Sequence, residues 1–192
     1  MSDFKELEAE AASIQREVGQ FNPRTDRLIS LLFAELRRLA TADQAERERY
    51  LYIDCEFNGG KGDLISMALV AEDGREFYEV VPLPTNIDPW VRANVVPILH
   101  KEPIPIAEFH NRLFAFLDQF KEPTIVADHP ADIAYFADAL ITNKMGQSYK
   151  CDWKALRRNV DYDSAMPHNA LADARALRAA LQSPVAAGRD EG

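Results

Sequence analysis

The period of the hydrophobic positions changes near Tyr50 and divides the chain into two parts. Before this point, apolar residues recur every three or four positions, which is typical of one face of a helix. Two such seams, Phe4–Phe21 and Leu28–Leu39, are separated by a proline. Because neither helix could bury its seam alone, we expect residues 1–49 to form a helical hairpin that docks on the rest of the chain or on a second copy in a homodimer.

From Tyr50 onward the pattern becomes that of strands, rich in aromatic and β-branched residues. We expect strands at residues 50–57, 63–71, 75–81, 123–127 and 148–151. We expect helices near Trp90 and at residues 106–120, 131–141, 154–158 and 168–182. Strands followed by alternating helices and strands predict an α/β fold with a mixed five-stranded sheet flanked by helices. Residues 50–183 would form this domain, and residues 184–192 would be a flexible tail.

The composition is that of an ordinary globular protein, since 47% of the 192 residues are hydrophobic and 28% are charged. Two cysteines are too few for a disulfide framework, and no stretch has the character of a secretory signal or a membrane span. We therefore expect a cytoplasmic protein that does not enter a membrane. The formal net charge of −9 disfavours a protein that grips long nucleic acid mainly through phosphate contacts.

Two acidic residues lie within the first expected strand. Asp54 and Glu56 are two positions apart, so their side chains would share one face of the strand. Two carboxylates on one face of an apolar strand repel each other and are costly to bury. A divalent cation with oxygen ligands, Mg²⁺ or Mn²⁺, would remove both costs. Other acid pairs with this spacing, such as Glu8 and Glu10, are interpreted as solvated.

Further candidate residues follow later strands. Asp132 opens a helix after the strand at 123–127, near the end of the sheet where α/β proteins bind ligands. Asp128 competes with it, but we interpret Asp128 as a turn or N-cap residue. His168 and Asp173 are five apart and cannot share a face in mid-helix. They converge only if His168 lies in the turn that precedes the last helix.

These residues occur in a fixed order: D-x-E in the first strand, an Asp after a later strand, and H-x₄-D at the last helix. The chain from Tyr50 to about Leu181 resembles the DEDDh superfamily of 3′-5′ exonucleases, which has a ribonuclease H-like fold and includes proofreading exonucleases, oligoribonuclease and RNase T. The matching segments are IDCEF, PADIAYF and HNALADARAL. A closer likeness to short bacterial 3′-5′ exoribonucleases rests on DCEF, LISMALVAEDGREFYEV and PWVRANVVPIL.

The resemblance implies a metal-dependent 3′-5′ exoribonuclease with two divalent cations, Mg²⁺ or Mn²⁺. Asp54, Glu56 and Asp173 would hold one ion, and Asp54 would bridge to a second ion that Asp132 also binds. His168 would be the general base on the attacking water, and the product would be a nucleoside 5′-monophosphate. The substrate would be the 3′ end of single-stranded or short RNA. Two alternatives stay open: an exonuclease acting mainly on single-stranded DNA, and a catalytically weak module that binds nucleic acid or a partner.

Five other side chains are candidates for substrate binding. Phe57 and Trp90 could stack a terminal base, although aromatic residues in such segments also fill cores. Arg157 and Arg158 could contact the substrate backbone, and a solvated helix face is the alternative. Lys61, in a glycine-rich hairpin without the spacing of a phosphate loop, could contact a phosphate.

Overall fold

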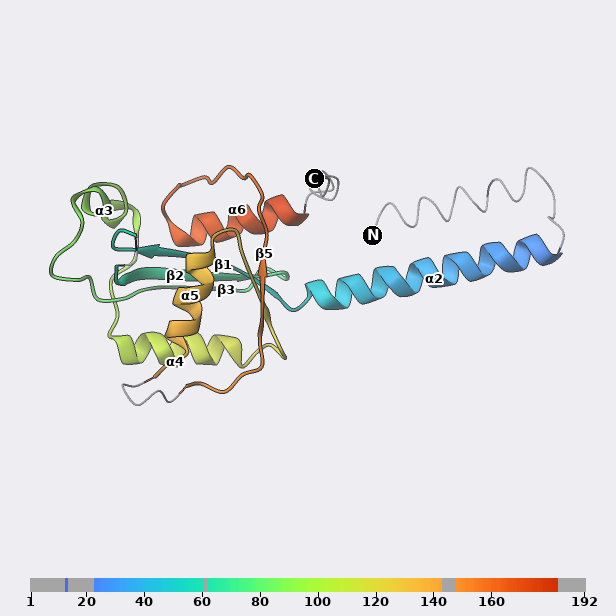
Figure 1. Cartoon of the computed structure of the whole chain (residues 1–192), viewed down its shortest axis with the longest axis horizontal. Helices are drawn as coiled ribbons and strands as arrows, with labels where there is room; N and C mark the ends of the chain where they lie inside the picture. Colours follow the sequence, from blue (N-terminus) through green and yellow to red (C-terminus); the bar gives the residue numbers. More distant parts are fainter. Residues whose placement is uncertain (1–12, 14–22, 61, 143–147, 183–192) are drawn as a thin grey trace. The chain divides into compact units, whose positions relative to one another are not determined.

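The computed structural model describes residues 13, 23–60, 62–142 and 148–182 (Figure 1). Contacts within the chain divide it into two compact units, residues 1–46 and 47–192. The expected first helix of the hairpin, apart from residue 13, and the expected tail lie outside the described residues. No helix in the described part of the chain is long and apolar enough to cross a membrane.

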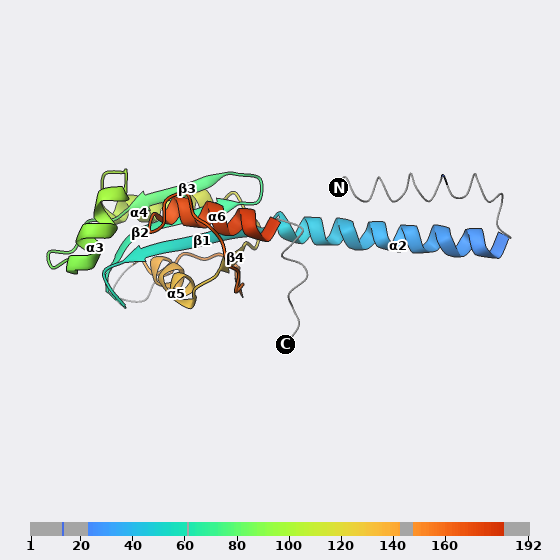
Figure 2. The ribbon, with the colours of Figure 1, turned by 90° about the horizontal axis from the view of Figure 1, so that it is seen from above.

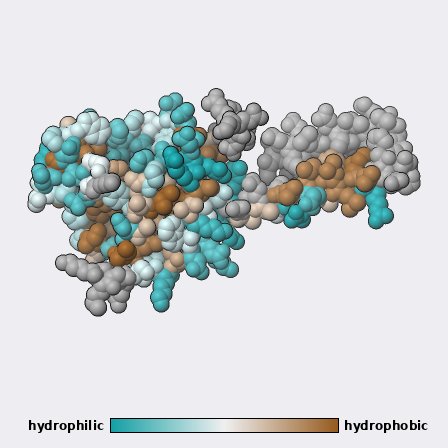
Figure 3. All heavy atoms as spheres, in the orientation of Figure 1, coloured by the Kyte–Doolittle hydropathy of each residue, from teal (hydrophilic) through white to brown (hydrophobic). Residues whose placement is uncertain are grey.

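The second expected helix of the first part is present as α2, Pro23–Arg47. Apolar residues run along it, as Figure 3 shows in brown. Its exposed large apolar side chains are Leu28, Leu31, Leu32, Leu36 and Leu39. The opposite charges of Glu35 and Arg38 pair along the helix at 2.7 Å. The docking or dimerisation that we expect for these residues stays a prediction.

The second unit is built on a five-stranded mixed sheet, as the sequence predicted. Its strands are β1 (Tyr50–Phe57), β2 (Leu64–Ala71), β3 (Glu76–Val80), β4 (Thr124–Ala127) and β5 (Lys154–Arg157). They lie in the order β3-β2-β1-β4-β5. The β1–β2 and β2–β3 pairs are antiparallel, whereas β4 is parallel to both of its neighbours. This arrangement is consistent with a ribonuclease H-like fold.

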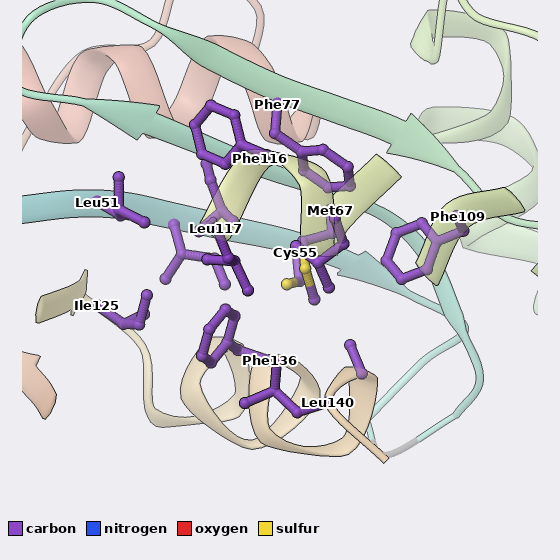
Figure 4. Close-up of a cluster of buried hydrophobic side chains, with 14 of the residues drawn as sticks. Leu51, Cys55, Met67, Phe77, Phe109, Phe116, Leu117, Ile125, Phe136 and Leu140 are labelled. Atoms are coloured by element: carbon purple, nitrogen blue, oxygen red, sulfur yellow. The ribbon is translucent and has the colours of Figure 1, made fainter. Parts of the chain in front are cut away.

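Helices cover both faces of the sheet (Figures 1 and 2). The helices of the unit are α3 (Pro89–Asn94), α4 (Ile106–Leu117), α5 (Pro130–Ala139) and α6 (Ala170–Gln182), with a 3-10 turn, η1, at Val96–Ile98. The largest core cluster joins α4 and α5 to the sheet, and Figure 4 shows its aromatic and aliphatic side chains meeting between them. The opposite face packs against α6.

Side chains along β1 alternate between these two faces. Leu51, Ile53 and Cys55 lie in the core cluster with α4 and α5. Tyr52 packs with Leu177 of α6 on the other face. Because the period of a strand is two, the same alternation places the two acidic residues that follow Tyr52 on the α6 face.

Two expected elements near the end of the chain are wrong. Residues 154–158 were expected as a short helix, but Lys154–Arg157 is strand β5, which pairs in parallel with β4. Residues 148–151 were expected as a strand, but the described residues there form only an isolated bridge between Ile141 and Ser148. The cause of the first error is tertiary: β4 is buried, so its outer backbone groups need a strand beside them.

Candidate metal centre

Three carboxylates meet between β1 and α6. Asp54 and Glu56 come from β1, and Asp173 comes from the first turn of α6. One carboxylate oxygen from each lies within 4.8 Å of the others. The small residues Ala170 and Ala174 face Ala68 and Val70 of β2, and this allows α6 to lie close to the sheet. The start of α6 therefore brings its acidic residue to the acidic face of β1.

A second group of three carboxylates lies where β4 ends. Asp54, Asp128 and Asp132 each place an oxygen within 4.8 Å of the other two. Strand β4 pairs with β1 only as far as Tyr52, so later β1 amides on that side have no strand partner. The Cys55 N–H donates instead to Asp132 Oδ1 at 3.2 Å. Asp54 belongs to both groups and links them into one cluster.

The four carboxyl groups expected to be metal ligands all resist ionisation. Burial, followed by repulsion from neighbouring carboxylates, raises the pKa of Asp54 well above its usual range and the pKa of Glu56 to about 8. Burial and then Asp128 raise the pKa of Asp132 to about 7. Burial also raises the pKa of Asp173, although the backbone N–H of His168 opposes the change.

The donor set fits divalent cations. Asp132 Oδ2 and Asp173 Oδ1 are buried and have no hydrogen-bond partner among the described residues. Buried anionic oxygens without donors are costly, and all the groups offered here are oxygens, which Mg²⁺ and Mn²⁺ prefer. The acidic cluster could therefore hold metal ions.

His168 lies just before α6, in the turn where the sequence required it to be. Its φ of 67° is in the left-handed region, and its backbone N–H donates to Asp173 Oδ2 at 2.9 Å. The imidazole is exposed and meets the edge of the Trp90 ring, with centroids 5.0 Å apart and an interplanar angle of 88°. The turn that precedes the helix thus joins the backbone of His168 to the Asp173 carboxylate of the acidic cluster.

Asn58 attaches the segment that carries Trp90 to the end of β1. Its Nδ2 donates to Asn86 O at 2.9 Å, and its Oδ1 accepts from the Asp88 N–H at 2.7 Å. Asp88 in turn caps α3 by accepting from the Trp90 N–H at 2.8 Å. Asn58, which lies two residues after Glu56, therefore fixes the start of α3.

Asn169 attaches the other end of that segment to α6. It is buried, its Nδ2 donates to Ile98 O at 2.7 Å, and its Oδ1 caps α6 by accepting from the Ala172 N–H at 3.1 Å. Asn58 and Asn169 were not identified from the sequence. The N-cap preference for Asn could have indicated Asn169, but the long-range partners of both residues have no local signal.

The four described candidates for substrate binding lie in different elements of the fold. Trp90 is 53% exposed beside His168. Phe57 is half-buried and stacks on Tyr135, with centroids 4.9 Å apart. Arg157 and Arg158 are exposed, and Arg157 Nε donates to the backbone oxygen of Asp128 at 3.1 Å. Lys61 lies outside the described residues. Their contacts with a substrate stay predictions.

The fold and the acidic cluster define an α/β protein with residues that could hold metal ions. No family model matches the chain. The chain is similar to two proteins named 3'-5' exoribonuclease: Rv2179c of Mycobacterium tuberculosis strain ATCC 25618 / H37Rv and MT2234.1 of Mycobacterium tuberculosis strain CDC 1551 / Oshkosh. Each match is 48% identical over 58 residues, which is 27% of this chain and 32% of the relative. The match thus spans about a third of the length of these curated relatives.

Proposed function

We propose that this chain is a divalent-metal-dependent 3′-5′ exoribonuclease of the DEDDh kind. The observation that carries the proposal is the two sets of three carboxylates that share Asp54. The backbone N–H of His168 donates a hydrogen bond to Asp173, which belongs to one of these sets. The partial similarity to proteins named 3'-5' exoribonuclease supports the choice of RNA. We assign the activity to residues 50–183.

The carboxylates would hold two ions. Asp54, Glu56 and Asp173 would bind one, and Asp54 with Asp132 would bind the other. When bound, such a metal pair clamps the scissile phosphate and stabilises the attacking and leaving oxygens. The protein's own contribution is to hold these oxygens at fixed positions on β1, α5 and α6, so that little rearrangement is needed during the reaction.

His168 would take the proton from the attacking water as general base. Imidazole is the side chain that most often has this role near neutral pH. The Asp173 carboxylate holds the backbone of His168, and the imidazole itself remains exposed. A proton taken from the water can therefore pass from the ring to solvent after each turnover.

An acidic chain would engage only a short stretch of nucleic acid. The net charge of −9 repels a long polyanion, whereas bound divalent cations attract phosphate locally. Trp90 and Phe57 would contact the terminal bases, and Lys61, Arg157 and Arg158 would contact phosphates. This combination of overall repulsion and local attraction favours the 3′ end of single-stranded or short RNA as substrate.

The test uses 5′-labelled single-stranded RNA, single-stranded DNA and circular RNA with Mg²⁺ or Mn²⁺. We expect the linear RNA to shorten one nucleotide at a time from its 3′ end. Asp54→Asn should lose at least 100-fold in rate, whereas the exposed Asp161→Asn should retain full activity. Faster digestion of DNA would replace RNA by DNA as substrate. Cleavage of the circle, or full activity of Asp54→Asn, would contradict the proposal.

A further inference from the structure

Asp128 lies in the bend between β4 and α5, but it is not the N-cap of the helix. It was expected as a turn or N-cap residue, but α5 begins at Pro130 and its N-cap is His129. The His129 Nδ1 accepts from the Ala131 N–H at 3.2 Å. The Asp128 carboxylate is therefore not used to cap the helix.

The Asp128 carboxylate is instead part of the acidic cluster and is held there by a neutral donor. Its Oδ2 accepts from the Tyr162 hydroxyl at 3.0 Å. The phenol hydroxyl is an uncharged donor, so this hydrogen bond orients the carboxylate without neutralising it. Arg157 contacts only the backbone oxygen of Asp128. The salt bridges formed by described residues all involve other acids.

A second observation indicates that the space between these carboxylates takes a cation. Asp132 is 2% exposed, and its Oδ2 has no hydrogen-bond partner among the described residues. Asp132 Oδ1 is already bonded to the Cys55 N–H. The group thus contains an unpartnered buried oxygen beside two further carboxylates, and no described cationic side chain forms a salt bridge with any of the three.

We infer that Asp128 is a third carboxylate ligand, with Asp54 and Asp132, of the second divalent cation, and that Tyr162 orients it. The inference rests on the proposed function and deepens it, since the resemblance assigned only Asp132 to this side of the cluster. Three carboxylates at this position bind a cation more strongly than two, because each adds a negative charge and an oxygen ligand. Tyr162 leaves the other oxygen of Asp128 available to the ion.

The test is Mn²⁺ binding to the full chain at pH 7.5, measured by calorimetry without RNA. The wild-type chain should bind two ions. Asp128→Asn should weaken one of them at least tenfold and leave the other unchanged, and Tyr162→Phe should weaken the same ion by a smaller factor. The exposed Asp161→Asn is the matched control and should bind both ions as the wild type does.

The outcomes separate this inference from the proposed function. If the wild type binds two ions and Asp128→Asn binds both with unchanged affinity, Asp128 is not a ligand and only the inference fails. If the wild type binds no ion, the metal-dependent function fails with it. Asparagine has the shape of aspartate and can still accept the hydrogen bond from Tyr162. Circular dichroism verifies that the variant is folded, and Tyr162→Phe tests the same position without changing a ligand.

Discussion

Replacing Glu56 by Gln should stabilise the metal-free protein at alkaline pH. Burial and the nearby Asp173 and Asp132 raise the pKa of Glu56 from its usual 4.5 to about 8. Because the folded-state pKa is the higher one, the stability that Glu56 contributes is complete below pH 4.5 and is lost as the pH rises through 8. One pKa unit corresponds to about 1.4 kcal/mol, so ionising Glu56 costs the folded protein up to about 5 kcal/mol.

The assay is urea unfolding with a chelator at pH 5 and pH 8.5. Neighbouring carboxylates share protons, so we expect the advantage of Glu56→Gln over the wild type to grow by at least ~2 kcal/mol between these two values. The exposed Glu102→Gln should show no such growth. Saturating Mn²⁺ should stabilise the wild type more than Glu56→Gln. Equal pH dependence in the wild type and Glu56→Gln would refute the reasoning.

Three further predictions concern single side chains. His168→Ala should lower kcat ~100-fold or more with unchanged Mn²⁺ binding, because its imidazole is in neither carboxylate group; an unchanged kcat would remove it as the base. Asn58→Ala should lower kcat at least ~10-fold by releasing α3, whereas Asn94→Ala, which loses one exposed bond, should change it less than ~2-fold; equal effects would contradict this. Glu79→Gln should lower the free energy of unfolding in urea by about 2 kcal/mol, because it removes the charge of a buried carboxylate that pairs with Lys101 and Arg112. The loss stays moderate because both partners are partly exposed, and unchanged stability would contradict the prediction.

Most strands could be predicted from the sequence because their residue types favour strands and the same segments are buried in the sheet. β1 and β2 are rich in aromatic and branched residues, and both are buried between helices. β5 could not be predicted in this way. Its residues, KALR, are good helix formers, and the strand exists only because it completes the sheet beside β4.

The part of the candidate site that could be predicted is the part that depends on the spacing of residues along the chain. The alternation of β1 placed Asp54 and Glu56 on one face, and the geometry of a helix start allowed His168 to approach Asp173. The contributions of other residues depend on contacts across the fold. Tyr162 reaches Asp128 from a position 34 residues later in the chain, so no local pattern indicates the pair.

The activity that we propose for the acidic cluster is the metal-dependent removal of single nucleotides from the 3′ end of RNA. Its most direct test is mass spectrometry of the first product released from an RNA with a unique 3′-terminal nucleotide. With Mg²⁺ or Mn²⁺, we predict the 5′-monophosphate of that nucleotide, and we predict its loss with a chelator or with Asp54→Asn. An internal fragment as first product, or unchanged release by Asp54→Asn, would contradict the proposed activity.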